Sequence, residues 1–264
     1  MTATLTPHPV HLVGAGPGDP ELLTLKAVRV LREATVILVD DLVGEQVLDT
    51  VLAGHSHPPR RVAVGKRGGC ASTPQAFIEK LMLREALAGE KVVRLKGGDP
   101  LVFGRAGEEM ATLRAAGVPV VVVNGITAGL AAVNALGTGW TDRDAGAQGV
   151  LLVTGHAQAG SPGPDWDAIG RVAASGLTLV IYMGVAQAPQ IAAALRAHLP
   201  ADWPAAAVQR ASTMAERCCL CTLGSLVDCL AREHIGSPAV LVIGRVLDRA
   251  NVHAWARAPQ AAMA

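Results

Sequence analysis

The stretch that decides the fold covers residues 91–109 and reads KVVRLKGGDPLVFGRAGEE. Residues 92–95 are mostly apolar and β-branched, which predicts a buried strand. The Gly-Gly-Asp-Pro sequence at 97–100 interrupts this strand, and a segment with helical character follows at 104–116. Such a sequence alone is also typical of an ordinary tight turn. However, adjacent glycines adopt positive φ and let the main chain approach a ligand closely, and open α/β sheets bind ligands where strands end.

The same alternation of apolar runs, turns and helical spacing continues on both sides. In the first half it predicts strands at 10–13, 35–39, 61–64, 92–95 and 118–123, and helices at 22–31, 72–88 and 104–116. After a break at Asn124-Gly125 it predicts strands at 150–153, 177–182, 205–209, 217–222 and 239–243, and helices at 127–136, 187–198 and 223–233.

This alternation predicts an α/β protein with two domains, at 8–123 and 124–247, and a flexible tail at 248–264. The sheet of the first domain is expected to be mostly parallel. In the second domain two strands follow each other directly, which favours a mixed sheet. Half of the 264 residues are hydrophobic, but only 3% are aromatic, so Ala, Val and Leu must fill the core.

The net charge of +1 and the scarcity of aromatic rings argue against a nucleic-acid partner. No apolar run is long enough to span a bilayer, and the first ten residues lack the pattern of a signal peptide. We therefore expect a cytoplasmic protein with no membrane partner, whose five cysteines are reduced thiols.

Two groups of potential metal ligands are interpreted as structural. Cys218 and Cys221 have a C-x-x-C spacing, but a strand sends them to opposite faces, so we expect small core side chains and no metal site. His55 and His57 lie in a turn-like stretch without a third ligand nearby and are expected in a solvated loop.

A dinucleotide-binding site is one alternative, because a glycine loop follows the first predicted strand and an acidic residue, Asp40, ends the second. Asp19 occupies the position of the third glycine in that fingerprint, where its carboxylate would repel a pyrophosphate. Pro17 also removes an N–H donor from the turn. These loops instead suit a ligand without phosphate that carries positive charge, such as S-adenosylmethionine.

Seven segments resemble the tetrapyrrole methylase family in order and spacing, from about residue 10 to residue 245: VHLVGAGPGDPELLTLKAVRVL, VILVDDLV, VGKRGG, VVRLKGGDPLVFGRAGEE, GITA, VTGH and YMG. The segments VGKR and RLKGGDPxxFGRxGEE are most similar to the branch of the family that acts on uroporphyrinogen III. The resemblance implies two α/β domains with the active site in the cleft between them, in a homodimer. It also implies two S-adenosylmethionine-dependent methylations, at C2 and C7, that give precorrin-2 for sirohaem, cobalamin or other modified porphyrins.

The resemblance also implies site residues. In the cofactor site it places Pro17, Gly97, Gly98, Asp99, Val102, Thr127, Ala128, Met183 and Ala211. Asp40 and Lys66 take the positions of proton acceptor and donor, and Arg105 and Glu108 those of assisting residues. From the residues themselves, burial and the neighbouring Asp41 are expected to raise the pKa of Asp40, which would suit a base.

The substrate carries eight carboxylates, and cations near the strand ends are candidates to bind them: Lys66, Arg67, Arg94, Lys96 and Arg105.

The chain departs from the family pattern at three places. Ala71 replaces a histidine, and Asn124 replaces a proline, which is expected to loosen the link between the domains. Asp142 stands where the family has histidine, and it would repel substrate carboxylates if its loop reaches them. Two alternatives therefore stay open: a methylase of a later corrinoid precursor, or a non-catalytic relative that binds S-adenosylmethionine. No appended dehydrogenase or chelatase domain is expected.

Overall fold

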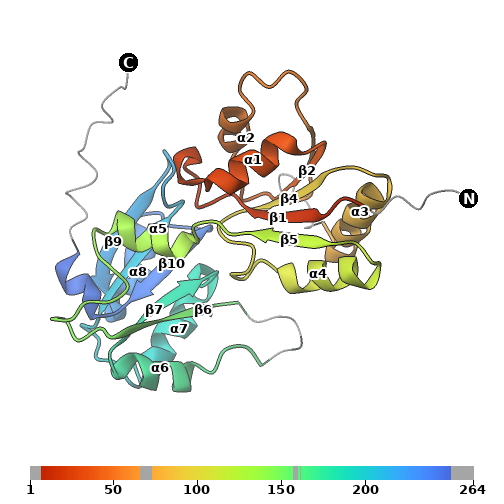
Figure 1. The fold of residues 1–264 in the computed structure, drawn as a ribbon. Coiled ribbons are helices and arrows are strands. Elements are labelled where there is room, and N and C mark those ends of the chain that lie inside the picture. The colour runs from red at the N-terminus through yellow and green to blue at the C-terminus, as the bar shows by residue number, and fades with distance from the viewer. Residues whose placement is uncertain (1–6, 66–72, 157–159, 161, 251–264) are drawn as a thin grey trace, which may run out of the picture. The chain divides into compact units, whose positions relative to one another are not determined.

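The computed structural model describes residues 7–65, 73–156, 160 and 162–250. The chain divides into two compact units, residues 1–127 and 128–264 (Figure 1). The boundary predicted at Asn124 lies four residues before the first residue of the second unit, Ala128. Asp248, the first residue of the predicted tail, lies in a short 3-10 helix, η4 (Arg245–Arg249), and the tail from residue 251 lies outside the described residues.

The first unit contains a five-stranded sheet in which every pairing is parallel, in the order β3-β2-β4-β1-β5. Its strands are β1 (Val10–Gly14), β2 (Val36–Val39), β3 (Arg60–Ala63), β4 (Val92–Lys96) and β5 (Val120–Val123). Its helices are η1 (Pro20–Leu22), α1 (Leu25–Glu33), α2 (Glu45–Val51), α3 (Gln75–Leu87) and α4 (Ala106–Ala115).

Two apolar layers cover this sheet, one on each face. Side chains of α1 and α2 pack with Val13, Ile37 and Leu95 on one face. Side chains of α3 and α4 pack with Leu12 and Leu38 on the other. Burial on both faces is typical of a parallel sheet and explains the nearly continuous apolar runs of its strands.

The second unit contains a mixed five-stranded sheet in the order β6-β7-β10-β8-β9, in which only β6 and β7 pair in parallel. Its strands are β6 (Gly149–Thr154), β7 (Leu177–Tyr182), β8 (Pro204–Gln209), β9 (Arg217–Thr222) and β10 (Ala239–Ile243). The helices other than η4 are α5 (Ala128–Ala135), α6 (Trp166–Ala174), η2 (Val185–Gln187), α7 (Ala188–Leu195), η3 (Leu223–Ser225) and α8 (Leu226–Arg232).

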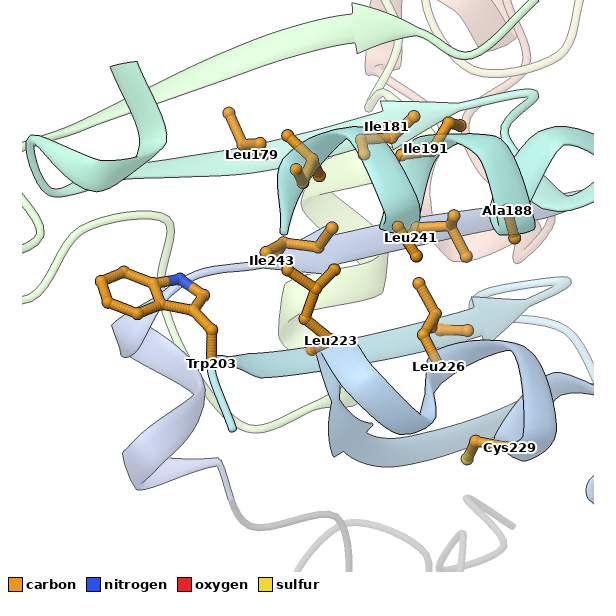
Figure 2. Close-up of a cluster of buried hydrophobic side chains, with 14 of the residues drawn as sticks. Leu179, Ile181, Ala188, Ile191, Trp203, Leu223, Leu226, Cys229, Leu241 and Ile243 are labelled. Atoms are coloured by element: carbon orange, nitrogen blue, oxygen red, sulfur yellow. The ribbon is translucent and has the colours of Figure 1, made fainter. Parts of the chain in front are cut away.

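The core of this unit also has two layers. Figure 2 shows the larger one, where Ile191 of α7 and Leu226 of α8 pack on Leu179, Ile181 and other residues of the sheet. Helix α5 and the segment η4 cover the opposite face. None of the helices in the described part of the chain is both long and apolar enough to cross a membrane.

The fold class predicted from the sequence is confirmed, with a parallel first sheet and a mixed second one. Every predicted strand is present within two residues of its predicted limits. Two helices, α2 and α6, were not predicted. The helix expected to include Pro74 in its first turn begins at Gln75, with Pro74 as its N-cap.

Candidate active site

The predicted residues of the first unit follow the carboxyl ends of parallel strands, so they lie at one edge of the sheet. Asp40 follows β2, and the glycine turn at 97–98 follows β4. The chain leaves β1 and β2 toward one face of the sheet and leaves β4, which lies between them, toward the other. Such a reversal opens a crevice at the strand ends, and α/β proteins bind ligands there.

The main chains of the loops after β1 and β4 are in direct contact at the point where the chain direction reverses. Gly98 has a φ of 65°, as expected for the turn, and forms an isolated antiparallel bridge with Gly16. The Gly98 N–H donates to the Gly16 carbonyl at 2.7 Å, and the Gly16 N–H donates back at 3.2 Å. A Cβ at Gly125 would lie 2.3 Å from the Gly98 carbonyl oxygen, so no side chain fits there. The loops after β1, β4 and β5 therefore converge with bare backbone.

The other predicted residues of these loops lie beside the bridge. Pro17 and Val102 are half-buried, and the Val102 N–H donates to the Asp99 carbonyl at 3.2 Å. Leu42 fills the space where a Cβ of Gly97 would lie, with the two carbons 2.8 Å apart. Gly97 therefore packs against the segment that carries Asp40.

Asp99 ties the ends of β4 and β5 together. Its carboxylate accepts hydrogen bonds from the N–H of Leu101 at 2.8 Å, the N–H of Gly125 at 3.1 Å and the side-chain amide of Asn124 at 3.1 Å. The residue is only 8% exposed, so these bonds take up most of its acceptor capacity. Asn124, which was expected to loosen the chain because it replaces a proline, is instead held by its side-chain hydrogen bond to Asp99.

A buried network of charges lies behind Asp40. The Arg94 guanidinium bonds to the Asp40 carboxylate at 2.9 Å and to Glu109 at 3.2 Å, and Lys96 bonds to both Glu109 oxygens at 3.2 Å. The Arg94 side chain is 3% exposed and that of Glu109 is 0% exposed. The expectation that Arg94 and Lys96 bind substrate carboxylates is wrong for this structure, because both cations point into the protein and are already paired.

The expected raised pKa of Asp40 is also wrong. Burial alone would raise the pKa of this carboxyl, but its hydrogen bond with the Asp41 side chain and the charge of Arg94 outweigh burial. The pKa therefore lies below its usual value near 3.8. The side chain stays 22% exposed, so the ionised carboxylate remains open to a ligand.

This lowered pKa predicts how Asp40 affects stability. A carboxyl with a lowered pKa in the folded state stabilises the fold above its unfolded pKa, and this contribution is lost as the pH falls through the folded value. We therefore expect the stability difference between wild type and Asp40→Asn to be largest near about pH 6 and to shrink toward about pH 3. Urea unfolding at both pH values measures it. A difference that grows in acid would contradict the ionised assignment.

Arg105 and Glu108 pair with each other. Two hydrogen bonds, at 2.9 and 2.7 Å, join the guanidinium to the carboxylate, and both side chains are more than half exposed. The bond to Glu108 raises the pKa of Arg105, and the bond to Arg105 lowers the pKa of Glu108. Lys66, the predicted proton donor, and Arg67 lie outside the described residues.

The predicted residues of the second unit gather at one edge of its own sheet. Met183 follows β7 and Ala211 comes two residues after β8, and both strands pair antiparallel to β10, so these ends lie at the same edge. Ala128 is the first residue of α5, and the next N–H, of Gly129, donates to the Tyr182 hydroxyl at 2.9 Å. Thr127, the last residue of the first unit, is half-buried.

Residues with positive φ occur at or next to several of the predicted site residues. The non-glycine residues with positive φ in the described part of the chain are Phe103, Arg105, Met183, Arg210, Ser212 and His234. All except His234 are predicted site residues or direct neighbours of one. Strained backbone of this kind is concentrated at functional sites in proteins.

Asp142, the acidic replacement, is held within its own loop. Its carboxylate accepts from the N–H groups of Asp144 at 2.8 Å and Ala145 at 3.0 Å, and Arg249 lies 3.8 Å away. The bond from Ala145 lowers the pKa of Asp142. The negative charge is thus partly satisfied by the protein itself.

Cys218 and Cys221 lie on opposite faces of β9, as predicted. The strand also places Cys219 on the face of Cys221, and Cys229 of α8 joins them, with all three sulfur atoms within 4.8 Å of one another. This grouping was not predicted from the sequence. A period of two links Cys219 with Cys221, but only the fold adds Cys229.

Comparison with known proteins gives a consistent result. Residues 9–227 match the Tetrapyrrole (Corrin/Porphyrin) Methylases. A uroporphyrinogen-III C-methyltransferase of Pseudomonas aeruginosa is 52% identical, over 90% of this chain and 93% of its own. A siroheme synthase of Gluconacetobacter diazotrophicus is 45% identical, and the match spans 49% of its length.

A solved structure extends the comparison. The uroporphyrin-III C-methyl transferase of Thermus thermophilus, complexed with S-adenyl homocysteine, has a TM-score of 0.76 and 43% identity, and the match covers 91% of this chain and 99% of that one. The sequence motifs, the two sheets and these similarities agree. The chain therefore belongs to the tetrapyrrole methylase family.

Proposed function

We propose that this chain is an S-adenosylmethionine-dependent C-methyltransferase, which methylates uroporphyrinogen III at C2 and C7 and forms precorrin-2. The main support is the bare glycine bridge between the loops after β1 and β4, at the ligand-binding edge of the first sheet. The Pseudomonas aeruginosa relative, matched over nearly its whole length, carries the name of this activity. The Thermus thermophilus neighbour holds S-adenyl homocysteine, the product of the methyl donor.

The residues present fit the methyl donor. The Gly16–Gly98 bridge offers main chain without side chains, and the ionised Asp40 provides negative charge at the same edge. In this proposal Pro17, Gly97, Gly98, Asp99 and Val102 hold the donor from the first unit. The family resemblance also assigns Thr127, Ala128, Met183 and Ala211 to donor binding. When bound, S-adenosylmethionine supplies an electrophilic methyl group on a positively charged sulfur.

The substrate needs both apolar and cationic contacts, because it is a large macrocycle with acidic side chains. Leu42, Leu101 and Phe103 expose apolar surface on the loops after β2 and β4. Arg105, on the same loop as Phe103, is the described cation of the predicted set that stays exposed. Its guanidinium fits a carboxylate in bidentate fashion, and a substrate carboxylate would compete with Glu108 for it.

The reaction itself places a modest demand on the base. The pyrrole carbon forms a bond to the methyl carbon, the carbon–sulfur bond breaks, and its electron pair stays on sulfur. The methylated ring then carries a positive charge and loses a proton readily. A carboxylate with a low pKa can accept such a proton, so the lowered pKa of Asp40 is compatible with its role as proton acceptor. Most of the rate enhancement comes from holding the two carbons at reacting distance.

Incubation of the full chain with S-adenosylmethionine and uroporphyrinogen III tests the proposal. We expect a tetrapyrrole with two added methyl groups, detected by mass spectrometry, and two equivalents of S-adenosylhomocysteine. Binding of the donor without any methylated product would indicate a non-catalytic relative. Methylation of a later corrinoid precursor, with none of uroporphyrinogen III, would assign the related activity instead.

The glycine turn yields a prediction with a matched control. Gly98 and Gly89 both have positive φ, 65° and 86°. Gly89, however, precedes β4 and is therefore away from the carboxyl ends of the strands, where the proposed site lies. Replacing either by alanine costs about 1–2 kcal/mol of backbone strain. We expect Gly98→Ala to weaken S-adenosylhomocysteine binding by about tenfold or more, equivalent to about 1.4 kcal/mol, and Gly89→Ala to leave it unchanged. Calorimetric titration measures both, and equal affinities would exclude the turn from the site.

We further infer that the protein acts in the cytoplasm as a homodimer. The described cysteines are free thiols, which suits a reducing compartment. The dimer rests on resemblance to the family, and light scattering of the purified chain tests it.

A further inference from the structure

Three cysteine sulfurs meet where the edge strand of the second sheet packs on a helix. Cys219 and Cys221 are two residues apart on β9 and point to the same face. Cys229 projects from α8 toward them and belongs to the apolar cluster of Figure 2. All three sulfur atoms lie within 4.8 Å of one another. Cys218, next to this group in sequence, packs on the other face of the sheet.

The spacing suits one metal ion. Zinc–sulfur bonds are about 2.3 Å long, so two sulfurs of a tetrahedral site are about 3.8 Å apart. Small side-chain rotations bring sulfurs from within 4.8 Å to that separation. Cys229 is 1% exposed and Cys219 is buried, while Cys221 is half-buried. Because Cys221 is partly exposed, solvent can supply a water as the fourth ligand.

A hydrogen-bond donor already lies beside one of the three sulfurs. A guanidinium nitrogen of Arg232 lies 3.5 Å from the Cys229 sulfur. A donor of this kind stabilises a metal-bound thiolate and orients it.

The charges favour a divalent, thiophilic ion. Three thiolates and one Zn²⁺ carry a net charge of −1, which Arg232 partly offsets. Zinc binds thiolates and not thiols, so binding of the ion releases protons and its affinity rises with pH.

We propose that Cys219, Cys221 and Cys229 bind one Zn²⁺ ion, which clips the edge strand β9 to helix α8. Soft thiolate ligands select zinc over magnesium or calcium. The ion takes no part in the proposed methyl transfer and stabilises the second unit. Its presence or absence is therefore tested independently of the proposed function.

The test compares two alanine variants of the full chain. Wild type, Cys229→Ala and Cys218→Ala are stripped with chelator, incubated with zinc chloride under reducing conditions, freed of unbound metal, and analysed for zinc. We expect wild type and Cys218→Ala to retain one equivalent more than Cys229→Ala. Zinc should raise the melting temperature of the first two and leave that of Cys229→Ala unchanged. Equal zinc content in the three proteins overturns the proposal.

A second measurement needs no variant, in case Cys229→Ala fails to fold. Iodoacetamide labels the wild-type chain with and without zinc, and mass spectrometry locates the label. Zinc should slow alkylation of the half-buried Cys221 by at least tenfold and leave that of Cys218 unchanged. An unchanged rate at Cys221 overturns the proposal.

Discussion

Replacing Glu109 by alanine is expected to lower the free energy of unfolding by about 3–5 kcal/mol, because it leaves two buried cations without their shared anion. Arg94 and Lys96 both bond to the Glu109 carboxylate, whose side chain has no exposure to solvent. Arg94 would keep Asp40, but Lys96 would lose its ion-pair partner. Urea unfolding, followed by circular dichroism, measures the loss.

The neighbouring residue provides a matched control. Glu108 is also a glutamate of the first turn of α4, but its side chain is 53% exposed and pairs with the exposed Arg105. Exposed ion pairs contribute about 1 kcal/mol or less, so Glu108→Ala should have a small effect. Glu109→Gln should lie between the two, because it keeps a hydrogen-bond acceptor and loses the charge. Equal losses for both alanine variants would refute the buried network.

Strands of the first sheet were predictable because each apolar run ends in a turn signal. The run at 92–95 leads to Gly97 and Gly98, and the pattern alone indicated a strand that ends at a ligand-binding edge. The interior cations were not predictable. Arg94 and Lys96 interrupt an apolar strand, and their partner Glu109 is more than ten residues away on α4, so only the folded chain shows that the charges are paired inside.

Helices α2 and α6, which were not predicted, differ in how clearly the sequence indicates them. Helix α6 begins after Asp165, whose carboxylate caps the Ala168 N–H at 3.0 Å, and Trp166, Ile169 and Ala173 recur at helical spacing. These signals were available in the sequence. Helix α2 has seven residues and a glycine N-cap without a side-chain bond, so packing of Val47 on the sheet determines it.

The pKa of Asp40 was predicted in the wrong direction, because burial and neighbouring charges shift it in opposite directions. Burial raises the pKa of a carboxyl, and the sequence showed a like-charged neighbour at Asp41. The structure adds Arg94, which lies 54 positions later and cannot be paired with Asp40 by local spacing. The position of Asp40 at a strand end was predictable, whereas its electrostatic environment required the tertiary structure.

Replacing Asp40 by asparagine should reduce kcat for methylation of uroporphyrinogen III by about 10², the low end of the usual contribution of a general base, because the methylated ring loses its proton readily. Asparagine has nearly the same shape but does not accept the proton that the methylated ring releases. The binding of S-adenosylhomocysteine should change little, since main chain forms most of the proposed donor site. Asp49→Asn, which removes an exposed carboxylate paired with Arg61 on the same unit, serves as the control and should keep full activity.

The pH profile separates a base from a residue that only positions others. If the Asp40 carboxylate accepts the proton, activity of the wild type should fall in acid as this group is protonated, below the ordinary carboxyl pKa near 3.8. The residual activity of Asp40→Asn should lack that acid limb. A variant that loses activity but keeps the same acid limb would show that Asp40 acts through the placement of Arg94, and full activity would remove it from the mechanism.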